Sequence, residues 1–269
     1  MNQFTLHYSA NGVWYGTFNH FAGLRIKHGI SARFGGTGIP PFHSLNLALH
    51  TGDCNENVIL NRQLFCQAIG VSSEELVTAQ QLHTDEIAVV TAKGQGAFRY
   101  DEAIPATDAL ITNIPGIPLM LFFADCVPVL IVDPVQRVVG VIHAGWRGTV
   151  EKIAQKTVLS MTANFGTKAA DCLVGIAPSI GPCCYAVDDT VLVKLKQQFS
   201  NWDSLIKETD SQVYLDLWKA NRVQLEEIGV NKNNIEISEV CTSCNHDLFF
   251  SYRKDNGLTG RIGAVIALE

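Results

Sequence analysis

The amino-acid sequence predicts an α+β fold in which layers of helices and strands enclose a large core. Strand-like and helix-like segments are mixed along the chain without strict alternation, which favours a layered architecture over a plain doubly wound sheet. Several short apolar runs rich in β-branched residues are bounded by Pro, Asp and Gly, a pattern typical of buried strands. No repeat or Pro/Ser-rich linker interrupts the chain, so we expect residues 1–269 to form a single large domain.

The elements follow from local patterns. Helices are indicated where apolar residues recur at helical spacing before a glycine, as before Gly70 and Gly166. A long polar loop occupies residues 28–53, and loops of this length in compact domains are usually functional. The expected strands are 13–18, 24–30, 76–80, 87–91, 118–124, 127–132, 138–142, 172–177 and 261–268, with 108–112 leading into the central ones, and the expected helices are 55–69, 147–165, 189–199 and 214–228.

Composition and charge restrict the class of protein. Hydrophobic residues make up 47% of the chain and charged residues 17%, which is a globular composition and not a disordered one. The formal net charge is −6, so the electrostatic basis for nucleic-acid binding is missing. The N-terminus lacks a signal-peptide pattern, and the most apolar window, 116–132, is short and contains Asp125. We therefore expect a cytoplasmic protein that binds neither nucleic acid nor membrane, with its eight cysteines as reduced thiols.

Polar side chains interrupt or end the central apolar runs. Asp125 and Cys126 separate two runs, and His143 ends a third before a Gly-rich turn. Burying a carboxylate, a thiol and an imidazole costs free energy unless they are paired or bind a metal, so we expect a site here. A catalytic zinc keeps three protein ligands and an open position, and His83, which follows segment 76–80, is the candidate third ligand. Spacing alone leaves open the alternative of separate, structural His and Cys residues.

At these positions the chain resembles a known family. The resemblance is carried by the segments SLNLALHTGD (44–53), NR (61–62), QLH (81–83), TDALITN (107–113), ADCVPVLIVDP (124–134), HAGWRGT (143–149), IGPCCYAV (180–187) and CTSCNHDLFFSYRKD (241–255). They are similar to the bacterial laccase-domain, or polyphenol oxidase-like, family, which is also described as purine nucleoside phosphorylases and, for one branch, as a peptidoglycan editing factor. The resemblance implies an α/β/β/α layered fold with mixed β-sheets. It also implies that His83, Cys126 and His143 bind a metal, generally zinc.

The name laccase can be compared with the ligands that copper requires. A multicopper oxidase needs a blue-copper site with two His and a Cys, and in addition a His-rich trinuclear cluster. The chain has eight histidines and no His-x-His pair, so a single site of two His and one Cys cannot supply such a relay. We therefore expect Zn²⁺ as the cofactor, with copper as the alternative because Cu²⁺ outcompetes Zn²⁺ at most such sites.

Phosphorolysis of a purine nucleoside, as the resemblance implies, suggests roles for further residues. Arg147, at an expected helix start, is a candidate to bind phosphate. Asp125 is a candidate proton donor or a residue that orients a metal ligand. Arg33, Asn46 and Arg62 are candidates to bind phosphate or ribose. The structural alternatives are that Arg147 caps a sheet edge and that Arg33 pairs with a surface carboxylate.

Several functions are compatible with these residues. The resemblance favours a zinc-dependent purine nucleoside phosphorylase that acts on adenosine, inosine or methylthioadenosine with phosphate, with adenosine deamination as a second activity. One alternative is a cysteine- or metal-dependent amidase that edits a peptidoglycan precursor, with Cys126 as its nucleophile in the cysteine-dependent case. The others are a copper-dependent polyphenol oxidoreductase and a metal-binding protein without catalysis. For the first function the partners are a purine nucleoside and phosphate, and we expect a monomer or a small homo-oligomer.

Two further groups of residues have structural explanations. Cys241 and Cys244 resemble half of a zinc knuckle, but no second Cys-x-x-Cys motif completes four ligands, so we expect a structural thiol pair. Cys183 and Cys184 lie in a Pro/Gly loop and are interpreted as packing residues, with a redox role as the alternative. Segment 249–253 is expected to belong to the core, the alternative being an aromatic wall that stacks on a purine.

Overall fold

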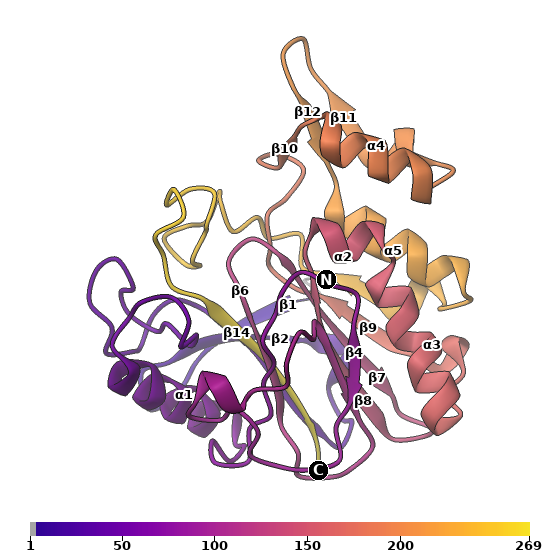
Figure 1. Cartoon of the computed structure of the whole chain (residues 1–269). Coiled ribbons are helices and arrows are strands. Elements are labelled where there is room, and N and C mark those ends of the chain that lie inside the picture. Colours follow the sequence, from indigo (N-terminus) through magenta and orange to yellow (C-terminus); the bar gives the residue numbers. More distant parts are fainter. Residues whose placement is uncertain (1–3) are drawn as a thin grey trace.

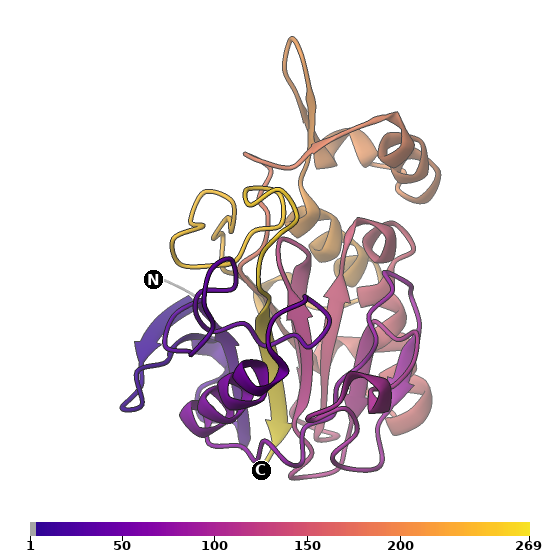
Figure 2. The same cartoon turned by 60° about the vertical axis from the view of Figure 1, so that its left-hand side comes forward.

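Two β-sheets packed face to face form the centre of the computed structural model, which describes residues 4–269 (Figures 1 and 2). The first sheet is antiparallel, with the strand order β1 (Phe4–Tyr8), β2 (Trp14–Phe18), β3 (Ile26–Ser31), β14 (Ile262–Leu268) and β6 (Leu119–Phe123). The last strand of the chain, β14, therefore lies inside this sheet, between β3 and β6.

The second sheet is mixed. Its order is β13 (Ile235–Ile237), β9 (Leu173–Ile176), β7 (Val127–Asp133), β8 (Val138–Ala144), β5 (Ala109–Thr112) and β4 (Ile87–Val89). The two outer pairs are parallel and the inner pairs are antiparallel. Every residue of β7 and β8 is buried, which explains why their sequences are continuous apolar runs and not alternating patterns.

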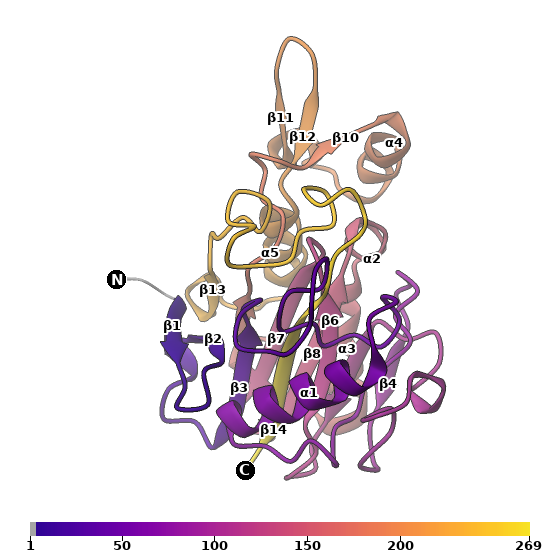
Figure 3. The ribbon, with the colours of Figure 1, turned by 90° about the vertical axis from the view of Figure 1, so that its left-hand side faces the viewer.

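Helices cover the outer face of each sheet, so the molecule has four layers (Figure 3). Along β7, Val129 and Ile131 face the cluster under the helices, whereas Leu130 and Val132 face the cluster between the sheets. The six-stranded sheet is covered by α2 (Trp146–Val150), α3 (Ile153–Phe165) and α5 (Leu217–Glu227), and the five-stranded sheet by α1 (Asn55–Ile69). This arrangement confirms the expected α/β/β/α layered fold with mixed sheets.

A small antiparallel sheet and one helix stand apart from these layers, at the top of Figure 1. The sheet has the order β10 (Ala186–Val187), β12 (Val213–Leu215) and β11 (Ile206–Glu208), and the helix is α4 (Asp189–Gln198). Short 3₁₀ helices occupy Asn19–Phe21, Tyr100–Glu102, Ala169–Asp171, Trp202–Leu205 and Lys232–Asn234. None of the helices within residues 4–269 has the length and apolar character that a membrane crossing requires.

Three of the expected segments take another form, and the strands β1, β10, β11 and β13 were not expected. Segment 147–165 is not one helix, because Lys152 adopts a left-handed conformation (φ 60°) that separates α2 from α3. Segment 214–228 begins as strand β12, and α5 starts only after Asp216, whose side chain accepts a hydrogen bond from the N–H of Lys219. Segment 76–80 forms only isolated bridges, through Val77 and Ala79. In each case the apolar residues fit the expected element, but the backbone conformation of one residue, a helix cap or the strand pairing decides the structure that forms.

Candidate metal centre

His83, Cys126 and His143 converge although they come from separate parts of the chain. Cys126 precedes β7 directly, and His143 lies near the end of β8, opposite Pro128 of β7, so the antiparallel register brings the two together. His83 lies on the loop before β4 and has a left-handed backbone (φ 61°). The Sγ of Cys126 is 3.7 Å from Nε2 of His83. One potential ligand atom from each of the three residues lies within 4.8 Å of the others.

A buried carboxylate, Asp108, contacts the ring of His143 and the backbone of His83. It directly precedes β5, and its Oδ1 lies 2.7 Å from Nδ1 of His143. The same oxygen accepts the backbone N–H of His83 at 3.2 Å, and the other oxygen accepts the N–H of Thr84 at 2.7 Å. Because Nδ1 of His143 is held in this way, its other ring nitrogen faces Cys126. We did not single out Asp108 from the sequence, although a carboxylate directly before a buried strand was an available signal.

The charges in this cluster stabilise the form of cysteine that binds metals. Burial raises the pKa of the Cys126 thiol, but the charge of His143 and hydrogen bonds to both imidazoles outweigh burial and lower the pKa to about 6. Burial lowers the pKa of His143, but the charge of Cys126 and the hydrogen bond to Asp108 raise the pKa to about 9. At neutral pH Cys126 is therefore a thiolate, the form that acts as metal ligand or nucleophile.

The backbone packs closely against the three side chains at Gly145. A Cβ atom at Gly145 would lie 3.0 Å from Cδ2 of His83 and 3.1 Å from Sγ of Cys126, so a side chain here would press on two of the three groups. Two imidazole nitrogens and one thiolate are a donor set suited to zinc, with the fourth tetrahedral position left for water or substrate. The residues present are therefore compatible with an open, catalytic type of metal site.

The three residues line a cavity of about 530 Å³. Its wall combines apolar and aromatic surface with cationic groups, which is typical of small-molecule sites. The other side chains that line it include Phe122, Ile180, Tyr185, Tyr252, Arg253 and Arg261. The potential metal ligands thus face a space that can hold an organic molecule.

Asp125 also lines this cavity, next to Cys126 in the sequence, and has a left-handed backbone (φ 82°). Its Oδ1 accepts a hydrogen bond from the hydroxyl of Thr242 at 2.7 Å. Its Oδ2 accepts the backbone N–H of Arg253 at 2.6 Å. Since both oxygens accept hydrogen bonds from the protein, the geometry favours a role in positioning the C-terminal segment over a role as proton donor.

Comparison with known proteins places the chain in a family. Residues 27–269 match the family described as multi-copper polyphenol oxidoreductase laccase. The chain belongs to this laccase-like family. The resemblance found in the sequence motifs is thereby confirmed.

Two relatives of this laccase-like chain carry the names of nucleoside-processing enzymes. A protein of Geobacillus stearothermophilus named purine nucleoside phosphorylase YlmD is 42% identical over 249 residues, which cover 91% of this chain and 89% of that protein. A protein of an unidentified prokaryote named adenosine deaminase RL5 is 33% identical, covering 82% of this chain and 85% of that protein. The crystal structure of YlmD from Geobacillus stearothermophilus has a TM-score of 0.93 with this fold, at 39% identity and with 100% of both chains covered.

Arg147 of this laccase-like chain is exposed at the start of α2 and does not line the cavity. Its guanidinium lies 4.5 Å from the centre of the Trp146 ring. The long helix that we expected to begin here is absent, and α2 contains only five residues. The dipole of so short a helix contributes little to anion binding, so phosphate binding by Arg147 would depend on its side chain alone.

Arg62, a candidate for binding phosphate or ribose, is instead enclosed in the protein. Its Nε donates to the carbonyl oxygen of Leu47 at 2.8 Å, and its Nη1 donates to those of Gly96 and Ala97 at 2.8 and 2.6 Å. Because these donors are engaged and the side chain does not reach the cavity, we assign Arg62 to the scaffold.

Asn46 and Arg33 likewise do not line the cavity. Asn46 is completely buried and donates to the carboxylate of Asp53 at 3.0 Å. Arg33 donates to the carbonyl oxygens of His43 and His246, at 3.1 and 2.7 Å, and does not pair with a surface carboxylate. Both side chains hold the long polar loop in place through these hydrogen bonds, and their binding of phosphate or ribose stays a prediction.

The cationic groups of the cavity come from the C-terminal segment. Arg261 lies 5.5 Å from the ring of Tyr252, and both line the cavity together with Arg253. Phe249 and Phe250 are buried between the sheets, so segment 249–253 contributes to the core at its start and to the cavity wall at its end. Arg261 was not a sequence candidate, because it lies at the beginning of an apolar strand where no motif distinguishes it.

Proposed function

We propose that this chain is a zinc-dependent purine nucleoside phosphorylase that acts on adenosine, inosine or methylthioadenosine with phosphate, and that it also deaminates adenosine. One observation carries the proposal. The His83, Cys126 and His143 side chains face a cavity whose wall has aromatic and cationic parts. A purine nucleoside and phosphate need both kinds of surface. The names of the relatives with 42% and 33% identity support the same class of substrate.

The chain's own residues account for binding and orientation. Phe122 and Tyr252 offer apolar surface to a purine, and Arg253 and Arg261 offer positive charge to phosphate. Asp125 holds the backbone of Arg253 and so helps to place its side chain at the cavity. A zinc ion held by His83, Cys126 and His143 would supply Lewis-acid chemistry at this wall.

The reaction transfers the ribosyl group from the purine to phosphate. An oxygen of phosphate forms a bond to C1′ of the ribose while the bond between C1′ and the purine nitrogen breaks. The electron pair leaves with the purine, which takes up the proton that the attacking hydrogen phosphate gives up, and the products are the free base and ribose 1-phosphate. The positive charge of Arg253 and Arg261 opposes the repulsion that would keep an anion out of an acidic protein.

A second candidate is favoured by the contacts of His143. This imidazole lies between the thiolate of Cys126 and the carboxylate of Asp108, which is the order of groups in a cysteine nucleophile with a base and an orienting acid. Such an arrangement suits an amidase that edits a peptidoglycan precursor. In the phosphorylase, Cys126 and His143 would instead be metal ligands, and Asp108 would be the hydrogen-bond partner of His143.

The copper alternative has less support from the arrangement of ligands. Among residues 4–269, two groups of three or more metal-binding side chains are found, the one described here and a group of four cysteines. Neither is a His-rich trinuclear cluster, which a multicopper oxidase requires besides its blue-copper site. A mononuclear copper centre would still use His83, Cys126 and His143.

The experiment is incubation of the purified protein with inosine or adenosine, with and without phosphate, followed by chromatography of the products. The proposal expects free base and ribose 1-phosphate only when phosphate is present, and inosine from adenosine. His143→Ala should abolish turnover, whereas Cys54→Ser, at an exposed cysteine far along the chain from this centre, should leave it unchanged. Release of an amino acid from a peptidoglycan fragment, with no nucleoside turnover, would favour the amidase.

A further inference from the structure

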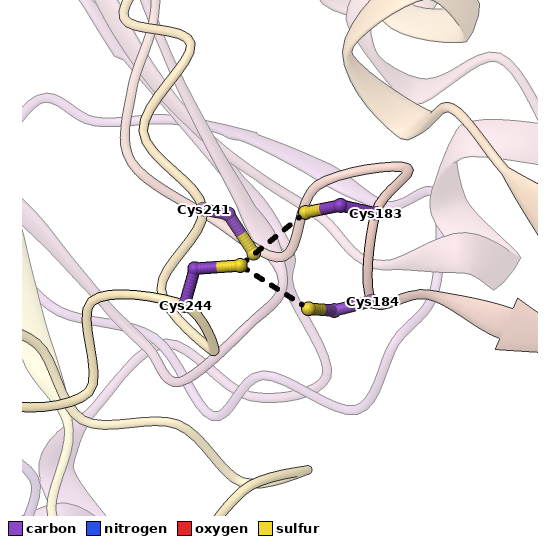
Figure 4. A group of neighbouring side chains, drawn as sticks. All are labelled: Cys183, Cys184, Cys241 and Cys244. Atoms are coloured by element: carbon purple, nitrogen blue, oxygen red, sulfur yellow. Dashed lines mark hydrogen bonds between the residues drawn. The ribbon is translucent and has the colours of Figure 1, made fainter.

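Four cysteines outside the proposed active site form a second cluster (Figure 4). Cys183 and Cys184 lie on the loop before β10, and Cys241 and Cys244 lie on the loop after β13. The Sγ of Cys244 is 3.5 Å from that of Cys183 and 3.4 Å from that of Cys184. All four sulfur atoms lie within 4.8 Å of one another. The two pairs, which the sequence presents as unrelated, are therefore one group in the folded chain.

The separations between the sulfur atoms suit a tetrahedral metal site. Zinc–sulfur bonds are about 2.3 Å long, so four sulfurs at the corners of a tetrahedron around zinc lie roughly 3.8 Å apart. The observed range, from 3.4 Å to at most 4.8 Å, brackets this value. All four residues are free cysteines, and they come from two loops that provide two ligands each.

The backbone around the cluster is arranged for close approach of these loops. The N–H of Gly181 donates to the Sγ of Cys241 at 3.2 Å, a contact that stabilises negative charge on the sulfur. A Cβ atom at Gly181 would lie 3.2 Å from Cβ of Cys241 and 2.7 Å from the ring of Trp218, so glycine is needed here. A parallel bridge between Ser179 and Cys241 holds the two loops side by side. Rigid backbone thus presents the sulfur atoms to a common point.

We propose that these four cysteines bind one zinc ion in a closed, structural site. Four thiolates fill the tetrahedral coordination of zinc and leave no position for a substrate, in contrast to the three-ligand centre. Zinc binding at such a site stabilises the folded state, because the ion joins two loops that are distant in the sequence. The adjacent residues Cys183 and Cys184 supply the two ligands that a second Cys-x-x-Cys motif would otherwise provide.

The site would brace one wall of the cavity. Tyr185, which lines the cavity, directly follows Cys184, and Ile180 lines it from the start of the same loop. Arg253 donates to the carbonyl oxygen of Cys184 at 3.4 Å. Thr242, which follows Cys241, donates to Asp125. Metal at the cysteines would therefore stabilise the positions of cavity residues without taking part in chemistry.

The test is the zinc content of protein purified under reducing conditions without added metal, measured by inductively coupled plasma mass spectrometry. The wild-type chain should contain about one zinc ion more than the variant Cys183→Ser/Cys244→Ser, which keeps only two of the four ligands. Cys126→Ala should keep this second ion, whatever it does to the first centre. Cys54→Ser, at an exposed cysteine outside both clusters, should have the zinc content of the wild type.

A spectroscopic measurement that does not use the double serine variant keeps the proposal testable if that variant does not fold. After zinc is replaced by cobalt, a tetrathiolate site gives strong sulfur-to-metal charge-transfer absorption, and the Cys126→Ala protein should keep this absorption. Equal zinc content in the wild type and the double serine variant would overturn the proposal. So would iron in place of zinc, or a disulfide among these cysteines in freshly purified, metal-free protein. None of these outcomes depends on nucleoside turnover, so failure of the proposed function is distinguished from failure of this site.

Discussion

At the scale of single residues, Asp108 has the largest effect on the geometry of the proposed active site. It is completely buried, and its two oxygens accept hydrogen bonds from the backbone of Leu82, His83 and Thr84 as well as meeting the imidazole of His143. One carboxylate therefore sets both the conformation of the loop that carries one proposed ligand and the ring orientation of another. Partners of this kind influence metal affinity although they do not touch the metal.

We expect Asp108→Asn to weaken zinc binding by roughly 10- to 100-fold, as is typical for loss of a carboxylate that orients a metal-binding histidine. The amide nitrogen that this change introduces would meet N–H donors that now point at oxygen, so part of the ligand loop must move. Competition with a chromophoric chelator measures the affinity. Asp101→Asn is the matched control, because Asp101 is exposed and pairs only with Arg99 on its own surface segment. Unchanged affinity in Asp108→Asn would contradict the orienting role.

The rate at which the Cys126 thiol is alkylated distinguishes a zinc ligand from a covalent nucleophile. If its thiolate is bound to zinc, alkylation by iodoacetamide should be slow until a chelator removes the ion. Mass spectrometry of Cys126 before and after chelation measures this, and Cys54, an exposed cysteine, reports the reactivity of an unprotected thiol in the same sample. Rapid labelling of the zinc-loaded protein that is blocked by substrate would instead indicate a covalent nucleophile.

At the scale of elements, α1 joins the long polar loop to the five-stranded sheet. Its end at Gly70 follows from a left-handed residue (φ 79°), a conformation that glycine adopts without strain. Its buried face carries Arg62, whose guanidinium lies 4.6 Å from the centre of the Phe122 ring. Because Phe122 lines the cavity, the helix supports the site from behind without contributing a ligand to it.

Arg62→Met should therefore destabilise the fold and have little direct effect on substrate binding. The change leaves the buried carbonyl oxygens of Leu47 and Ala97 without their donor, whereas the carbonyl oxygen of Gly96 keeps the hydroxyl of Thr78. This loss should cost about 3 kcal/mol of the free energy of unfolding, measured with urea. Arg222→Met is the control, because Arg222 forms only a surface pair with Glu226 on α5 and should change stability by less than about 1 kcal/mol. A large rise in KM for phosphate without loss of stability would show that Arg62 binds substrate after all.

At the scale of the whole molecule, the pH affects stability through histidines that the folded chain keeps uncharged. His28 of β3 accepts the backbone N–H of Phe18 through Nε2 at 3.0 Å, next to the ring of Phe21. Burial, and to a smaller extent the charges of His20 and His7, lowers the pKa of His28 from 6.5 to about 4. The folded state therefore holds His28 neutral over a pH range in which the unfolded chain protonates it.

This difference predicts a loss of stability in mild acid. Above pH 6.5 neither state binds the proton, so the contribution is fully present, and it is lost as the pH falls from 6.5 to about 4 because the unfolded state binds more protons there. The contribution of His28 is about 3 kcal/mol, and His20 and His50, whose pKa values burial also lowers to about 4, add to the loss over the same range. Urea unfolding between pH 7 and 4 measures it. His28→Gln, which keeps an acceptor, should make the dependence less steep, whereas His43→Gln, at an exposed position, should leave it unchanged. An equally steep dependence in His28→Gln would contradict the prediction.

The sequence by itself determined the features whose signals are local. The apolar runs of β6, β7 and β8 identified buried strands, because a strand covered on both faces needs apolar residues at every position. The limits of α1 agree with the structure residue by residue, because a glycine ends the helix. The motifs around His83, Cys126 and His143 led to the family, which the match over residues 27–269 confirms.

Only the tertiary structure decided which distant side chains meet. Strand register placed Asp108 beside His143, and a parallel bridge brought Cys241 towards the loop of Cys183 and Cys184. The packing of α1 against two loops engaged the donors of Arg62 with the carbonyl oxygens of Leu47, Gly96 and Ala97. Local periodicity records which face of an element is buried but not which partner lies opposite, because partners are set by the pairing of strands and by loops that cross between layers. Scaffold arginines and site arginines therefore look alike until the chain is folded.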